Sequence, residues 1–207
     1  VVLSTDIFDE FMEENNLYSI GLSDAGDREI LDAFLKARLP FRIHKDLLVF
    51  ISIISGPVAI RSSSLLEDSH FQPFAGVYST YMVPFDANSK THTLQMITEA
   101  IKAVYASVFY HDSKTYMAAT KNLIDEEKMA IVLQEICGSA YENRYYPSFS
   151  GVARSLNYYP IGNEKPEDGI ANIAMGLGKY IVDGGKTLRF SPAYPNNVLQ
   201  TSTLEFM

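Results

Sequence analysis

Residues 58–64, with the sequence V-A-I-R-S-S-S, carry the first side chains whose types and spacing suit a chemical role. The guanidinium of Arg61 is a planar fork of N–H donors, and the three serines after it add hydroxyl donors at the same point. This combination suits a phosphate chain. Taken alone, however, the segment is more typical of a strand that ends in a serine-rich turn with an exposed arginine.

Three further places in the chain could hold a nucleotide. Gly76 and Gly151 lack a Cβ, so the backbone at these positions can approach phosphates closely. Gln134, Glu135 and Ile136 end a predicted buried strand, where backbone N–H and C=O groups can contact the edge of an adenine while Ile136 packs on its ring. Each place also has an ordinary alternative, because glycines are common in turns and every buried strand has an end.

The order of these segments resembles the nucleotide-binding domain of the phosphoenolpyruvate synthase and pyruvate phosphate dikinase family. That domain has a strand V-A-V-R-S-S, then E-D, then S-F-A-G followed four residues after the glycine by threonine. This chain departs from the pattern at Pro73, in place of the usual serine, and at residues 77–78, V-Y in place of a polar pair. The matching segments, over roughly residues 57–185, are V-A-I-R-S-S at 58–63, Glu67-Asp68, F-A-G at 74–76, Thr80, I-V-L-Q-E-I at 131–136, S-G-V-A at 150–153 and G-L-G at 176–178.

The resemblance implies an α+β fold of the ATP-grasp type, present here in part, with mixed or antiparallel sheets and packed helices. It also implies ATP and Mg2+ as cofactors. In the family, the ATP domain phosphorylates a histidine on a separate swivelling domain, and a third domain transfers the phosphoryl group to pyruvate to make phosphoenolpyruvate. The implied roles are phosphate binding and polarisation by Arg61 as the catalytic residue, a phosphate turn at Gly76 and Thr80, cofactor binding at Gly151, and adenine binding by Gln134, Glu135 and Ile136.

Parts of the family pattern are not found in these 207 residues. The lysine segment G-G-K-N expected upstream is missing, and the glutamate and glutamine strands that hold Mg2+ and ribose are expected beyond Met207, as are the phosphohistidine and pyruvate domains. We therefore expect a piece of a larger ATP-dependent phosphotransferase, of the pyruvate, water dikinase or pyruvate, phosphate dikinase type, that is inactive alone and binds nucleotide weakly. The acceptor stays open, because related phosphotransferases that act on a glucan or an antibiotic share such a domain.

Two other functions fit the same residues. A non-catalytic ATP-binding or regulatory module could keep this fold, with Arg61 making an ionic contact to a partner, and the departures at Pro73 and at residues 77–78 keep that alternative open. An α+β domain without a nucleotide could also carry the arginine segment as a surface loop. The sequence leaves open whether copies of the chain form a homo-oligomer.

Hydrophobic periodicity predicts the elements that must position these residues. Together with the resemblance, which implies the ATP-grasp type, residues 1–56 are expected to form a helical N-terminal segment of the ATP-binding region, and residues 57–207 an ATP-grasp-like nucleotide-binding domain truncated at both ends. Helices are expected from Thr5 onward, around residues 30–35, over 94–109 and over 113–122. Strands are expected at 58–60, 77–83, 130–133, 170–175 and 180–182.

Composition narrows the class of protein. With 47% hydrophobic and 20% charged residues, the chain is typical of a soluble globular protein of one or two domains. Its net charge of -8 disfavours nucleic acid and anionic membranes, but screening over about 10 Å still permits a local ATP site. One cysteine excludes a disulfide framework and favours a reducing cytoplasm. The four histidines share no metal-like spacing, and a P-loop is excluded because residue 180 is tyrosine rather than glycine.

Overall fold

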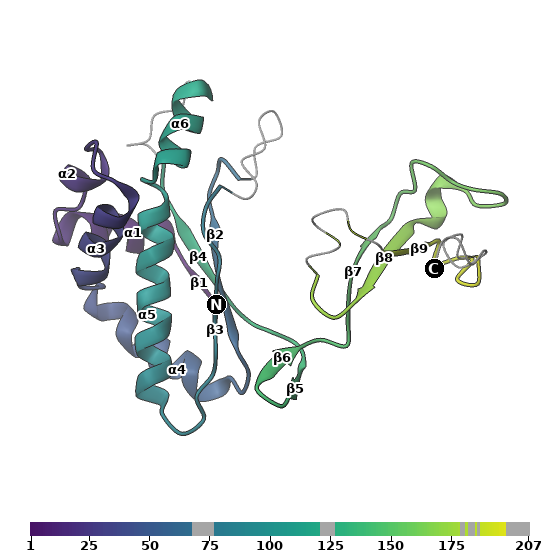
Figure 1. Cartoon of the computed structure of the whole chain (residues 1–207), viewed down its shortest axis with the longest axis horizontal. Helices are drawn as coiled ribbons and strands as arrows, with labels where there is room; N and C mark the ends of the chain where they lie inside the picture. The colour runs from purple at the N-terminus through teal and green to yellow at the C-terminus, as the bar shows by residue number, and fades with distance from the viewer. Residues whose placement is uncertain (68–76, 121–126, 179–180, 182–184, 186, 198–207) are drawn as a thin grey trace. The chain divides into compact units, whose positions relative to one another are not determined.

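The computed structural model of the chain describes residues 1–67, 77–120, 127–178, 181, 185 and 187–197 (Figure 1). It divides into two compact units, Val1–Ile136 and Cys137–Met207. Helices and antiparallel strands both occur, which confirms the α+β class. Among the described residues, no helix has the length and apolar character needed to cross a membrane.

The first unit is a layer of helices on one face of an antiparallel sheet with the strand order β1-β4-β2-β3. Helix α5 packs on β2 and β3, α1 packs on β4, and α3 and α4 pack on α5 (Figure 1). The elements are β1 Val2–Leu3, α1 Thr5–Glu14, α2 Tyr18–Gly21, α3 Asp27–Lys36, α4 Phe41–Ile53, β2 Val58–Ser63, β3 Tyr81–Val83, α5 Lys90–Ser107, α6 His111–Thr120 and β4 Ala130–Glu135.

The spacing of apolar residues explains the helices. In α1, Ile7, Phe8, Phe11 and Met12 form one stripe, and all four are buried. Helix α5 begins after Ser89, whose hydroxyl accepts the His92 N–H at 3.2 Å and so satisfies one of the free amides at the helix start. The predicted helices at these places are therefore confirmed, although α5 begins at Lys90 rather than at residue 94.

Strand β3 is shorter than the sequence predicts. Only Tyr81–Val83 is paired as a strand, whereas the prediction covered residues 77–83. The Tyr78 side chain is buried, and the Ser79 N–H donates to the Ser107 hydroxyl at 3.2 Å instead of to a neighbouring strand. The prediction failed because β-branched and aromatic residues favour any half-buried extended segment, paired or not.

The helices that precede residue 57 and the strands that follow it share one hydrophobic core. Phe34 of α3, Leu47 of α4, Ile60 of β2 and Leu133 of β4 all belong to it. The first unit accordingly extends from Val1 to Ile136. The division of function between residues 1–56 and 57–207 stays a prediction.

The second unit contains a hairpin and a three-stranded antiparallel sheet of order β7-β8-β9. Strand β8 confirms the strand predicted at residues 170–175, whereas most of the one predicted at 180–182 lies outside the described residues. The elements are β5 Ser139–Tyr141, β6 Arg144–Tyr146, β7 Phe149–Arg154, the 3-10 turn η2 Pro166–Asp168, β8 Ile170–Met175 and β9 Leu188–Phe190.

An aromatic cluster forms the centre of the helical layer. The Tyr105 ring lies 5.1 Å from that of Phe8 and 5.4 Å from that of Phe11, measured between centroids. Its hydroxyl is buried and has no hydrogen-bond partner among the residues that the structure describes. Burial also raises the pKa of Tyr105, so the phenol stays protonated. Tyr105 thus contributes as an aromatic ring, and its hydroxyl carries a desolvation cost.

Replacing Tyr105 by phenylalanine should leave the free energy of unfolding unchanged or raise it by up to about 2 kcal/mol, because an unpaired buried hydroxyl is removed. Phe34→Ala in the same cluster should lower it by about 3–5 kcal/mol through the cavity it leaves. Urea denaturation measures both. A clear loss of stability in Tyr105→Phe would contradict the absence of a partner for this hydroxyl.

Candidate functional site

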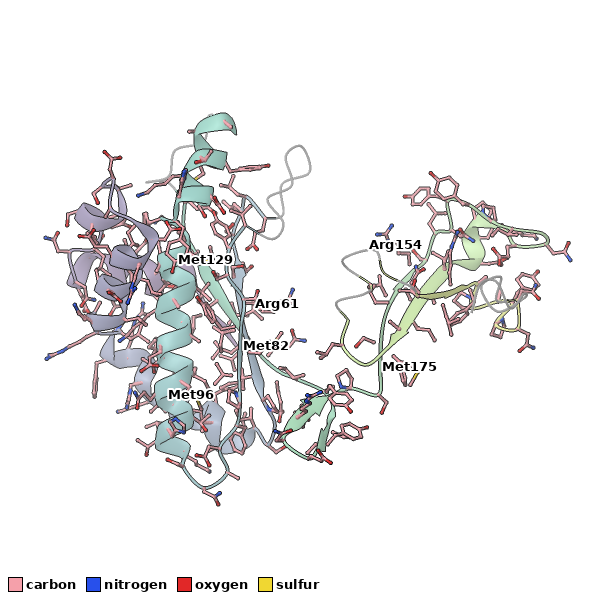
Figure 2. The ribbon with its side chains drawn as sticks, in the orientation of Figure 1. Arg61, Met82, Met96, Met129, Arg154 and Met175 are labelled. Carbon is pink, nitrogen blue, oxygen red and sulfur yellow. The ribbon has the colours of Figure 1, made fainter. Side chains whose placement is uncertain are left out.

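The sheet of the first unit has a second face, on the side away from the helices. Residues alternate between the two faces along a strand, so Ile60 and Leu133 are buried against the helices while Arg61 and Gln134 point the other way. Figure 2 shows Arg61 and Met82 on the side of the strands away from α5. We call this surface the arginine face; its residues are Ala59, Arg61, Ser63, Met82, Val132 and Gln134.

Two of the predicted site residues, Arg61 and Gln134, meet on the arginine face. Arg61 lies opposite Val132, and its Nη1 donates to Oε1 of Gln134 at 3.4 Å, a long contact. Thr80 is exposed and directly precedes β3, whose first residue, Tyr81, pairs with Ile60. Residues 61 and 134, far apart in the sequence, therefore lie on adjacent strands of one surface, and Thr80 lies one residue before the third strand.

Arg61 is available to an anion. Its side chain is exposed, and in the described part of the chain no carboxylate lies within ion-pair distance of it. The weak contact with the neutral Gln134 amide orients the guanidinium without neutralising it. A fork of donors held in this way suits an oxyanion such as a phosphate.

Met82 is a member of this surface that the sequence reasoning missed. It lies opposite Ala59 and is 65% exposed, which is unusual for a large apolar side chain in a strand. The alternation along β3 could have located it, because Tyr81 and Val83 are the more buried neighbours. Met82 adds an exposed apolar surface next to the arginine.

The three serines after Arg61 do not act together. Ser62 lies on the helix side of the strand and donates to Oε1 of Glu67 at 2.9 Å, and Ser64 accepts the Glu67 N–H at 3.3 Å. The expectation of several hydroxyl donors beside the guanidinium is therefore wrong for Ser62 and Ser64, because successive strand residues face opposite ways. Ser63 alone shares the arginine face.

Glu135 holds the connection between α4 and β2. Its Oε1 accepts the N–H groups of Ser55 and Gly56, each at 2.7 Å, and these bonds lower the pKa of Glu135 below its usual value. The Ile136 N–H donates to Pro57 O at 2.8 Å, so it continues the antiparallel hydrogen bonding between β4 and β2. Because backbone groups alternate in direction, those of Glu135 point to the other edge of β4.

Gly151 lies in β7 opposite Ile173 of β8. A Cβ at Gly151 would come within 2.8 Å of Asn172 O, so the close approach of the two strands requires glycine there. The hydroxyl of Ser150 donates to Gly176 O at 2.7 Å, and Gly176 has a φ of 74°. The S-G-V-A and G-L-G segments of the sequence therefore lie together in the second unit.

One predicted site residue has no structural description. Gly76 lies outside the described residues. Within the parts of the chain that are described, no group of three or more His, Cys, Asp or Glu side chains could hold a metal ion.

Comparison with known proteins identifies the relatives of this chain. Residues 1–200 match the family described as Pyruvate phosphate dikinase, AMP/ATP-binding domain. The protein named Uncharacterized phosphotransferase YvkC, from Bacillus subtilis (strain 168), is 28% identical over 197 residues. That alignment covers 90% of this chain and 20% of the relative, so the chain spans about a fifth of the relative's length.

The bonds to Glu135 predict a dependence of stability on pH. The pKa is lowered in the folded state, so the stabilisation is complete above the ordinary value of 4.5 and is lost as the pH falls through the lowered pKa. Wild type should therefore be more stable than Glu135→Gln at pH 6, and the difference should shrink at pH 3. The midpoints of urea denaturation at pH 6 and at pH 3 measure this difference in stability. Glu14→Gln, at an exposed position in α1, is the matched control. A difference that is the same at both pH values would contradict the bonds.

Proposed function

This chain belongs to the family of pyruvate phosphate dikinase AMP/ATP-binding domains, and we propose that it is the ATP-binding portion of a phosphotransferase that phosphorylates a histidine on a swivelling domain. Phosphoenolpyruvate synthesis from pyruvate is the proposed overall reaction. The fold we propose for the nucleotide-binding region is ATP-grasp, with the other domains and the phosphoryl acceptor supplied by the remainder of a longer protein.

The observation that carries this proposal is the meeting of Arg61 and Gln134 on one exposed sheet face, with Thr80 directly before the neighbouring strand β3. A guanidinium and an amide on adjacent strands, together with the hydroxyl that precedes the third strand, provide donors for a polyphosphate chain. All three positions match the family's motif, and a surface loop without a ligand would not need them together. The exposed Met82 offers an apolar surface beside them.

In this proposal, Arg61 binds the phosphate oxygens of ATP and polarises the group that is transferred. Negative charge on the equatorial oxygens and on the leaving group must be stabilised as the phosphoryl group moves from ATP to the histidine. A preoriented cation does this without reorganisation at the moment of reaction, which is commonly a large term in catalysis. Thr80 directly precedes β3, and its hydroxyl and backbone would shape the phosphate turn with Gly76.

The adenine would lie against the end of β4. The Ile136 N–H already donates to Pro57 O, and the Glu135 carboxylate already accepts the N–H groups of Ser55 and Gly56. Neither of these groups is therefore the adenine contact. The backbone N–H and C=O of Glu135 point to the opposite edge of the strand and are the better candidates. Ile136, which is half-buried, would pack on the ring.

Mg2+ is a family cofactor that these described residues do not accommodate by themselves. The arginine face carries no carboxylate, and the described chain has no metal-binding cluster. Hard divalent cations prefer carboxylate and water oxygens. The contribution derived from this chain is therefore that of Arg61 and its neighbours.

The alternative of a non-catalytic module rested in part on Tyr78, where the family has a polar residue. The Tyr78 hydroxyl donates to Glu127 in a buried contact. Packing accounts for this departure, and Arg61 remains exposed. These observations favour the enzyme over the module.

The first experiment is a calorimetric titration with ATP and Mg2+ of this chain and of a longer chain, extended at both ends to include the lysine, glutamate and glutamine segments of the family. We expect the longer chain to bind ATP and the 207-residue chain to bind it weakly or not at all. Absence of binding by both would contradict the proposed function and favour a structural or regulatory module.

The second experiment removes the proposed catalytic cation. In the longer, active protein, Arg61→Ala should lower phosphoryl transfer at least about tenfold, corresponding to about 1.4 kcal/mol of lost transition-state stabilisation. Arg61→Lys should retain part of the activity, because it keeps the charge but loses the planar fork. Arg28→Ala, which removes the same charge at an exposed position of α3, is the control. Unchanged turnover in Arg61→Ala would remove Arg61 from the site.

A further inference from the structure

A buried hydrogen bond joins the segment before β3 to the segment before β4. The Tyr78 hydroxyl donates to Oε1 of Glu127 at 3.0 Å, and both side chains are buried, with exposed fractions of 5% and 8%. The two residues are 49 positions apart in the sequence. A buried carboxylate needs such donors, because its desolvation is otherwise unfavourable.

The residue after Tyr78 is held as well. The Ser79 N–H donates to the Ser107 hydroxyl at 3.2 Å, and this buried hydroxyl donates in turn to Val104 O at 2.7 Å, at the end of α5. Two consecutive residues are therefore anchored to different parts of the core. The next residue is Thr80, which directly precedes β3.

The other end of the hydrogen bond is equally constrained. Glu127 is followed by Lys128, which pairs with Asp9 of α1, and by Met129, which is fully buried. Strand β4 starts at the next residue, Ala130, and carries Gln134 to the arginine face. Glu127 thus belongs to a fixed part of the first unit and can serve as an anchor for a less regular segment.

We propose that the Tyr78–Glu127 hydrogen bond positions Thr80 for the phosphates of ATP, and that Tyr78 and Glu127 are positioning residues of this site. The inference rests on the proposed function, in which Thr80 shapes the phosphate turn. Residues 77–80 are not paired in the sheet, so side-chain anchors must set the backbone there. Burial and the nearby Glu127 raise the pKa of Tyr78, which keeps its hydroxyl a donor.

The test compares ATP with adenosine, which lacks phosphates, by calorimetry on the longer protein described above. Tyr78→Phe should weaken ATP binding about fivefold, the size expected for one lost hydrogen bond, and leave adenosine binding within about twofold. Glu127→Gln keeps an acceptor oxygen and should retain ATP affinity, whereas Glu127→Ala should behave like Tyr78→Phe. The double variant Tyr78→Phe/Glu127→Ala should be no weaker than either single variant, because both remove one interaction.

Tyr105→Phe is the matched control, because it also removes a buried phenol hydroxyl, but one without a hydrogen-bond partner in the described part of the chain. Tyr105→Phe should change neither the affinity for ATP nor the affinity for adenosine. ATP binding by Tyr78→Phe equal to wild type would overturn the inference. Equal weakening of ATP and adenosine would also overturn it, since that result would indicate a general loss of structure.

Hydrogen exchange of the ligand-free 207-residue chain provides a readout that does not depend on ATP. The Ser79 and Thr80 amides should exchange faster in Tyr78→Phe than in wild type, and not in Tyr105→Phe. If the longer wild-type protein binds no ATP, the proposed function fails and the phosphate role of Tyr78 fails with it. Exchange would then still decide whether the hydrogen bond anchors this segment, and unchanged exchange would overturn the anchor itself.

Discussion

The antiparallel pairing of β2 with β4 is the constraint on which the remainder of the first unit depends. Its register places Arg61 opposite Val132 and Ile60 opposite Leu133. A slip by one residue would exchange the two faces of a strand, moving the guanidinium toward the helices and an isoleucine to the surface. Both changes are strongly unfavourable, because a charge would lose water and a large apolar side chain would lose its burial. The hydrophobic core therefore enforces the direction in which Arg61 points.

The helix side of β2 shows how polar residues are accommodated next to that core. Ser62 and Ser64 interact with Glu67, and Tyr78 interacts with Glu127. The Glu67 carboxylate accepts from the Ser62 hydroxyl, and the Glu127 carboxylate accepts from the Tyr78 hydroxyl, as buried acceptors require. Alternate residues of this short motif therefore have different roles: Ser62 and Ser64 stabilise the fold, and Arg61 remains exposed for a ligand.

Membership of the dikinase nucleotide-binding family was predicted from the order of several short segments and is confirmed by the match over residues 1–200. The prediction succeeded because the order and spacing of several short segments are together unlikely to agree with a family pattern by chance. The structure joins two of those segments in the second unit, where Ser150 binds Gly176 O. The roles of the predicted site residues in binding ATP remain proposals, and Gly76 lies outside the described residues.

By itself, the sequence determined the helices α1, α3 and α5, the strands β2, β4 and β8, and the exposure of Arg61. These features depend on residue spacing over one or two turns or a few strand positions, and local spacing is what a sequence displays directly. Only the tertiary structure decided that Gln134 lies beside Arg61, that Glu135 binds Ser55 and Gly56, and that Tyr78 binds Glu127. Each of these contacts joins segments distant in the chain, and their pairing follows from how the whole core packs rather than from any local pattern.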